Sequence, residues 1–150
     1  MNIPEGFRPL SMEGNPFLAR NGPLYGRWAD GRFTLGFPIA EHHCNPGKTI
    51  HGGMIATLAD MTLLFGCNLQ GNIHQYLLTV TLTTDFLGPA QAGEWLEGTC
   101  QVLRAGRNMV FAQGLLAVGN RPVARLNGIF KPTGEPNSRP GLAREFGLVD

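Results

Sequence analysis

The residues best suited to acid–base chemistry gather in one short segment, from Asn45 to Asp60. Gly52 and Gly53 open a run without proline, which predicts a helix whose first backbone N–H groups have no partner inside the helix. Unpaired amides at the positive end of a helix dipole can stabilise a negatively charged oxygen. His51 directly precedes the glycine pair and Asn45 lies in the preceding loop, so both side chains can donate hydrogen bonds to the same region.

Asp60 is the only charged residue between Thr49 and Ile73. An unpaired carboxylate inside an apolar helix costs on the order of several kcal/mol unless it is paired or neutralised. The positions three and four residues away carry no cation, being Ala56, Thr57, Leu63 and Leu64. Asp60 therefore either meets a partner from elsewhere or serves as a working acid or base.

Two of these features also have a purely structural interpretation. The Gly52-Gly53 pair fits a tight loop that leads into a helix, and His51 fits a helix cap or a core residue with satisfied hydrogen bonds. The structural interpretation is weakest for Asp60, which therefore carries the functional hypothesis.

The spacing within this segment predicts how many chains form the site. Gly53 and Asp60 are seven residues apart and share one helix face, about 10 Å from each other along the axis. That distance is too large for both groups to reach one carbonyl. If both act on the same substrate, they come from different subunits, which predicts a homodimer with composite sites; pairing of dimers into a tetramer is left open.

Local signals predict one helix surrounded by antiparallel strands. Residues 1–23 contain four prolines and predict an extended strap or a loose N-terminal arm, while Asp30-Gly31 between two mixed runs predicts a β-hairpin. Residues 54–67 predict an enclosed helix, because apolar side chains lie on nearly every side. The later strands, whose short connections imply antiparallel neighbours, are expected at 77–86, 94–104, 108–119 and 122–132.

A single apolar helix must be covered, and these elements can cover it with a curved antiparallel sheet, giving an α+β fold. The domain is expected to span residues 24–132, and residues 133–150 are expected to form a peripheral, turn-rich tail.

Composition narrows the possible partners and compartments. A formal net charge of +1 with scattered basic residues gives no reason to expect nucleic acid or an anionic membrane as a partner. The longest apolar stretch, 54–67, is too short to cross a bilayer. Three separated cysteines without a CxxC pair predict reduced thiols, and no signal peptide is evident, so a cytoplasmic location is expected. His42 and His43 in a strand would point to opposite faces, so no shared metal is expected.

The loop that begins at Asn45, the HGG triplet at 51–53 and the LAD triplet that ends at Asp60 resemble one family of enzymes. They are similar to the phenylacetic-acid-degradation (PaaI-like) type of hotdog-fold acyl-CoA thioesterase, and the likeness covers residues 24–132. The resemblance implies the hotdog fold, in which a curved antiparallel sheet wraps one central helix.

The same resemblance implies roles for the residues of the motif. Asp60 matches the catalytic carboxylate, which attacks the thioester or activates water. The N–H that polarises the carbonyl is placed at Gly52, with Gly53 as the alternative, and Asn45 and His51 match the polar pair that accompanies it across the interface.

Two positions outside the motif are assigned by the resemblance as well. Thr79 falls where a serine or threonine assists the nucleophilic water in some members, although it also fits an ordinary strand residue. The turn containing Arg104, Gly106 and Arg107 lies near the nucleotide end of CoA in similar proteins, and arginine forks suit phosphate. A solvated hairpin tip is the alternative.

The expected function is hydrolysis of an acyl-CoA thioester to the free acid and CoA, without a cofactor because CoA is part of the substrate. A non-catalytic acyl-CoA binding or sensing protein is the first alternative, and the buried base argues against it. A hydratase or dehydratase ranks third, since His51 is the only histidine near the acid in sequence. The acyl group is expected to be aryl or short to medium in length, with apolar walls from Met54, Met61, Leu64, Phe65 and Phe86.

Overall fold

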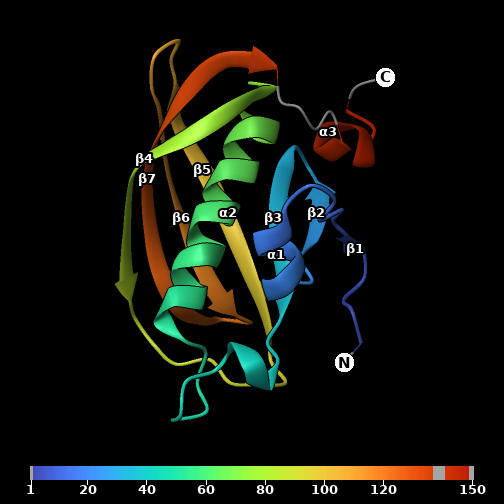
Figure 1. Cartoon of the computed structure of the whole chain (residues 1–150), viewed down its shortest axis with the longest axis vertical. Helices are drawn as coiled ribbons and strands as arrows, with labels where there is room; N and C mark the ends of the chain where they lie inside the picture. Colours follow the sequence, from blue (N-terminus) through green and yellow to red (C-terminus); the bar gives the residue numbers. More distant parts are fainter. Residues whose placement is uncertain (1, 137–140, 149–150) are drawn as a thin grey trace.

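A seven-stranded antiparallel sheet curves around one long helix in the computed structural model, which describes residues 2–136 and 141–148 (Figure 1). The predicted α+β arrangement is confirmed. In chain order, the elements are β1 (Arg8–Pro9), α1 (Pro16–Asn21), β2 (Tyr25–Ala29), β3 (Arg32–Pro38), η1 (Glu41–His43), α2 (Gly52–Gln70), β4 (Gln75–Phe86), β5 (Trp95–Ala105), β6 (Val110–Val118), β7 (Arg121–Pro136) and α3 (Gly141–Glu145).

The β2–β3 hairpin forms where the sequence predicts it. Ala29 pairs with Arg32, so Asp30 and Gly31 make up the two-residue loop. Both loop residues have a positive φ, 52° and 71°, as a type I′ turn requires. This turn matches the twist of the strands and sets the register of the first part of the sheet.

The central helix α2 extends beyond the predicted range of 54–67 at both ends. Its sheet-facing side is closed, since Leu63 has no exposed surface and a Cβ added at Gly98 of β5 would collide with Thr62. Its opposite side is only half-buried, so the expectation of a helix enclosed on all sides is wrong. The half-buried positions on that side include Asp60, Met61, Leu64 and Phe65.

Helix α2 is longer than the apolar stretch expected at residues 54–67, which changes the length used in the membrane argument but not the expectation itself. With 19 residues and a mean hydropathy of 1.3, the helix is long and apolar enough by composition to cross a membrane, unlike the shorter predicted segment. Within the fold, 56% of this stretch is buried, and Asp60 lies near its middle.

The strand order across the sheet is β1-β2-β3-β5-β6-β7-β4. Short connections predicted antiparallel neighbours, which holds for β5–β6 and β6–β7 but is wrong for β4, because β4 pairs with β7 instead of β5. The connection over residues 87–94 permits this, since eight residues span up to about 26–29 Å and three strand spacings need about 14 Å. Strand β4 is therefore an edge strand within the described chain.

The N-terminal segment packs onto the domain and contains a short helix, so of the two alternatives predicted for residues 1–23 the loose arm is wrong. The Leu18 N–H donates to the Asn15 side chain at 3.1 Å, which caps the short helix α1. Leu10 and Leu18 are only 6% and 2% exposed, so they anchor the segment in the core.

The C-terminal end also differs from the predicted peripheral tail. Strand β7 continues to Pro136, past the expected domain boundary at residue 132, and Ala143 of α3 is buried. Helix α3 lies beside β2 and β3, on the side of the molecule where the N-terminal segment also runs (Figure 1). The remaining residues of that predicted tail, 137–140 and 149–150, lie outside the described residues.

Candidate active site

The start of α2 presents one backbone amide without an acceptor. The N–H groups of Met54 and Ile55 donate to the His51 carbonyl, at 2.9 and 3.0 Å, and the Gly53 N–H donates to His51 Nδ1 at 2.9 Å. The Gly52 N–H has no acceptor in the part of the chain that the structure describes. Of the two glycine amides considered from the sequence, Gly52 is thus the one available to a ligand.

His51 has a second polar atom to offer at this position. Because Nδ1 accepts the Gly53 N–H, the neutral ring carries its proton on Nε2. The side chain is exposed, so this N–H faces solvent close to Gly52. His51 is therefore both the helix cap of the structural interpretation and a potential donor.

Asn45 is engaged in its own loop. Its Nδ2 donates to Thr49 Oγ1 at 3.0 Å, and its Oδ1 accepts the Thr49 N–H at 3.3 Å. These bonds close the turn that precedes the helix, and no hydrogen bond joins Asn45 to Gly52 in the described residues.

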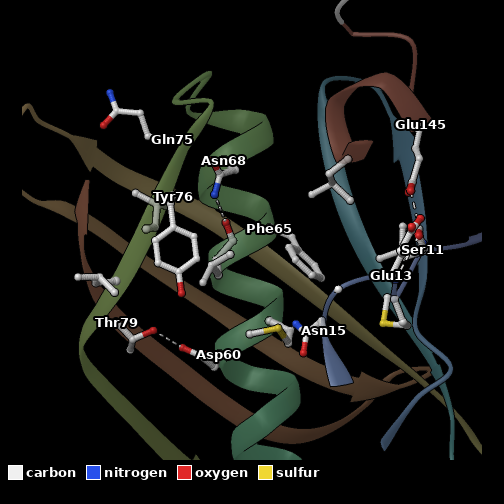
Figure 2. A pocket seen from close by; sticks show the side chains of 18 of the residues that line it. Ser11, Glu13, Asn15, Asp60, Phe65, Asn68, Gln75, Tyr76, Thr79 and Glu145 are labelled. Carbon is white, nitrogen blue, oxygen red and sulfur yellow. Dashed lines mark hydrogen bonds between the residues drawn. The ribbon is translucent and has the colours of Figure 1, made fainter. Parts of the chain in front are cut away.

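Asp60 and Thr79 are predicted site residues on two different elements that contact each other directly. The Thr79 hydroxyl on β4 donates to Asp60 Oδ1 at 2.7 Å (Figure 2). Within residues 2–136 and 141–148, Asp60 takes part in no ion pair. Burial raises the pKa of the Asp60 carboxyl above its usual value, and the Thr79 hydrogen bond opposes that rise with a smaller effect.

A cleft of about 940 Å³ opens in front of this carboxylate. Figure 2 shows Tyr76 and Thr79 of β4 on one side, Asp60 and Phe65 of α2 behind, and the N-terminal segment with Glu145 on the other side. Of the walls expected from the sequence, Met61, Leu64 and Phe65 line the cleft. Met54 is instead buried in the core, and Phe86 is not among the lining residues.

Phe86 lies at the start of α2, beside Gly52. A Cβ built on Gly52 would be 3.5 Å from the Phe86 ring, and Phe86 itself is 59% exposed. The Gly52 amide is thus flanked by an apolar wall that the residue types alone did not place there. The closeness of the end of β4 to the start of α2 is a tertiary contact without a local signal.

A single chain does not bring the Gly52 amide and the Asp60 carboxylate together. Gly52 and Asp60 are eight residues apart on one helix, or about 12 Å along its axis. No hydrogen bond joins His51 and Asp60 in the described residues, so the His–acid pair of a hydratase is not formed within the chain.

The residues expected to contact CoA lie elsewhere. Arg104, Gly106 and Arg107 are at the β5–β6 turn, at the opposite end of the molecule from the start of α2 (Figure 1). Both arginines are exposed, and neither lines the cleft. The turn is closed by a hydrogen bond from the Gly106 N–H to the Met109 carbonyl at 2.9 Å.

His42 and His43 lie in η1 rather than in a strand, which corrects the premise that they point to opposite faces. Their ring centroids are 3.9 Å apart. No group of three or more potential metal ligands occurs among the described residues, and the three cysteines are free thiols.

Comparison with known proteins identifies the family. The sequence model of the thioesterase superfamily matches residues 47–121, half of the chain, including the helix start, Asp60 and Thr79. The chain belongs to the thioesterase superfamily.

Relatives of this thioesterase narrow the assignment. The Pseudomonas aeruginosa protein PA0474, classed by its name as an esterase, is 40% identical over 87% of this chain and 97% of its own length. The Escherichia coli acyl-coenzyme A thioesterase PaaI is 36% identical over 52% of this chain and 54% of PaaI.

Solved structures agree with the fold of the thioesterase. The E. coli PaaI structure matches with a TM-score of 0.73 at 24% identity, covering 83% of this chain and 90% of PaaI. The Bacillus halodurans protein BH2602, determined with CoA, matches with a TM-score of 0.65 at 26% identity, covering 71% and 72% of the two chains. The prediction of a PaaI-like hotdog thioesterase is confirmed.

The raised pKa of Asp60 predicts a stability effect that needs no substrate. The folded state keeps the Asp60 proton to a higher pH than the unfolded state. The stability of the fold therefore falls as the pH rises from 3.8, the ordinary pKa of an aspartate, through the raised pKa of Asp60. Asp60→Asn removes this loss and still accepts the Thr79 bond, so its Tm should exceed that of wild type at neutral pH. The gain should shrink as the pH falls.

Thermal unfolding at neutral and mildly acidic pH measures this difference. Asp85→Asn is the matched control, because Asp85 is ion-paired with Arg125 at 2.9 Å and lies on the surface; it should give no such gain. A lower Tm for Asp60→Asn than for wild type at neutral pH would contradict the burial argument.

Proposed function

We propose that this thioesterase hydrolyses acyl-CoA to the free acid and CoA, in a site shared between two copies of the chain. The observation that carries the proposal is the half-buried Asp60 carboxylate, which has no ion-pair partner in the described residues and opens onto a cleft. The relatives support the substrate class, since PaaI is an acyl-CoA thioesterase and BH2602 was determined with CoA.

Asp60 supplies the attack on the thioester carbonyl. As a general base it takes a proton from water, whose oxygen then adds to the carbonyl carbon; as a nucleophile it forms a mixed anhydride that water cleaves. In both routes the C–S bond breaks, and the CoA thiolate leaves and takes up a proton. The hydroxyl of Thr79 donates to the carboxylate and holds it in place, and in this proposal it also helps to orient the attacking water.

The Gly52 amide polarises the carbonyl oxygen of the substrate. It is the unpaired donor at the positive end of α2, where developing negative charge is stabilised. In this proposal His51 Nε2 donates a second hydrogen bond to the carbonyl oxygen. The Asn45 amide becomes a further donor when substrate contacts the loop of residues 45–49 and displaces its bond to Thr49. Phe86 beside Gly52 limits water at this point and so strengthens the interaction.

A second copy of the chain supplies the missing half of each site. Asp60 needs a Gly52 amide that its own helix holds about 12 Å away. The open edge of β4 gives the place for pairing, since an unpaired strand edge that carries exposed apolar side chains favours association. The exposed residues on β4 and just after it are Tyr76, Leu78, Val80, Phe86 and Leu87.

The nucleotide end of CoA binds at the turn of Arg104, Gly106 and Arg107 in this proposal. Two exposed guanidiniums at a narrow turn suit phosphate oxygens, and no other group in the described residues forms an ion pair with them. CoA is part of the substrate, so the reaction needs no cofactor. Free thiols support a cytoplasmic location.

Replacing Asp60 by Asn tests the chemistry directly. The substitution keeps the shape and removes the base, so kcat with several acyl-CoAs should fall by about 10²–10⁴-fold. The wild-type rate should also fall as pH decreases through the raised pKa of Asp60, because only the ionised form attacks. Release of CoA followed with a thiol reagent measures both effects; near-normal turnover by Asp60→Asn would reject the mechanism, and tight CoA binding without turnover by wild type would favour a binding protein.

Replacing Gly52 by Pro tests the amide. Gly52 is the first residue of α2, where proline is tolerated, and His51 has the extended backbone (ψ 139°) that a following proline requires. The substitution removes the N–H and adds a ring next to Phe86; from the loss of the N–H we expect kcat to fall by about 10²–10³-fold with a near-normal Tm. Gly52→Ala adds a methyl group but keeps the N–H, and it is the control for crowding against Phe86. Equal losses in the two variants would assign the effect to crowding.

Mixing the two variants tests the composite site. Hybrid dimers of Asp60→Asn and Gly52→Pro chains contain one intact site, so random assembly should restore about one quarter of wild-type activity. Co-expression with two affinity tags isolates the hybrids for assay. If the hybrids are as inactive as each parent, the two groups act within one chain.

A further inference from the structure

We propose that the strap, residues 10–16, is the specificity wall of the cleft, which admits uncharged acyl groups and limits their length through Met12. This inference rests on the proposed function, because it assigns the cleft in front of Asp60 to the acyl group. The strap forms the side of the cleft opposite β4, as the positions of Ser11, Glu13 and Asn15 in Figure 2 show.

The strap is fixed at both of its ends. Leu10 is buried, and its N–H donates to the Leu24 carbonyl at 2.9 Å, which continues the β1–β2 pairing. At the other end Asn15 caps α1, and Leu18 is buried in the core. The residues between these anchors therefore form a stable wall rather than a loose segment.

Helix α3 holds the strap from the outside. The Arg8 guanidinium donates to the Glu145 carbonyl at 2.5 Å and lies 5.4 Å from the centroid of the Phe146 ring. The Ser11 N–H donates to Glu145 Oε1 at 3.4 Å. The two ends of the described chain thus close one side of the cleft together.

Charge in the cleft favours uncharged acyl groups. The charged residues that line it are Glu13, Asp60 and Glu145, and no lysine or arginine of the described chain does so. Arg8 is turned to the Glu145 backbone and the Phe146 ring instead. Glu145 Oε2 is buried without a hydrogen-bond partner in the described residues, so a second carboxylate on the acyl group would meet uncompensated negative charge.

Met12 is placed to limit the length of the acyl group. It is partly buried against the core and lines the cleft together with the apolar residues of α2 that face it. Methionine is flexible and adapts to different apolar shapes, so its removal extends the cleft and a larger side chain shortens it. These apolar residues of α2 are Met61, Leu64 and Phe65.

The test uses the full chain and purified acyl-CoAs. For the wild type, kcat/KM should be at least about tenfold higher for hexanoyl-CoA than for adipoyl-CoA, which has the same carbon count and a terminal carboxylate. Glu145→Gln should narrow that ratio. Equal rates for the two substrates in the wild type would overturn the inference, whereas no turnover of any acyl-CoA would overturn the proposed function itself.

Variants of Met12 test the length limit with a straight-chain series. Met12→Ala should move the best substrate to longer chains, and Met12→Trp should lower kcat/KM for the longer substrates by about tenfold while the shortest are unaffected. Opposite shifts cannot result from loss of stability. Phe17→Ala is the control, because Phe17 is exposed on α1 and does not line the cleft. An unchanged length profile in both Met12 variants would refute the role of the strap.

Discussion

The hydrogen bond between Thr79 and Asp60 joins the two elements on which the site depends. A carboxylate on the half-buried face of an apolar helix has its pKa raised by burial, so it is destabilising in the folded state when ionised. The Thr79 hydroxyl fixes the position of the carboxylate and partly offsets the desolvation. An ionised carboxylate held in this way lowers the stability of the fold, because one hydrogen bond does not fully offset its desolvation. The same property suits it to act as a base, and such a trade between stability and activity is usual at active sites.

Helix geometry then determines the assembly that the chemistry needs. The helix that carries Asp60 also carries the Gly52 amide, and its fixed rise keeps them about 12 Å apart. No side-chain motion removes that separation, because both groups belong to one rigid element. In the proposed dimer, a second copy docked at the edge of β4 would supply the complementary group, and the exposed apolar residues of β4 would become buried. In the proposed mechanism, catalysis therefore requires dimerisation.

The features that the sequence predicted are those with local causes. Asp30-Gly31 specifies its turn by positive φ, and the lone carboxylate at Asp60 is visible because its helical neighbours are all uncharged. The position of β4 beside β7 was not predictable from connection length, since an eight-residue link reaches several positions in a sheet. The packing of Leu10 and Leu18 was missed for a similar reason: prolines indicate where a long helix cannot form, but not which surface a segment covers.

A β-bulge in β4 explains how one strand contacts both Asp60 and Gly52 on α2. Thr79 and Phe86 are seven residues apart, so strict alternation would place them on opposite faces of the sheet. The register shifts between Thr79 and Thr81, so that Thr79 pairs with Phe130 and Phe86 with Ala124, two residues that are fully buried on the helix side. The bulge thus lets Thr79 contact Asp60 while Phe86 lies beside Gly52. Without the bulge, either Asp60 would lose its contact with Thr79 or Gly52 would lose its contact with Phe86.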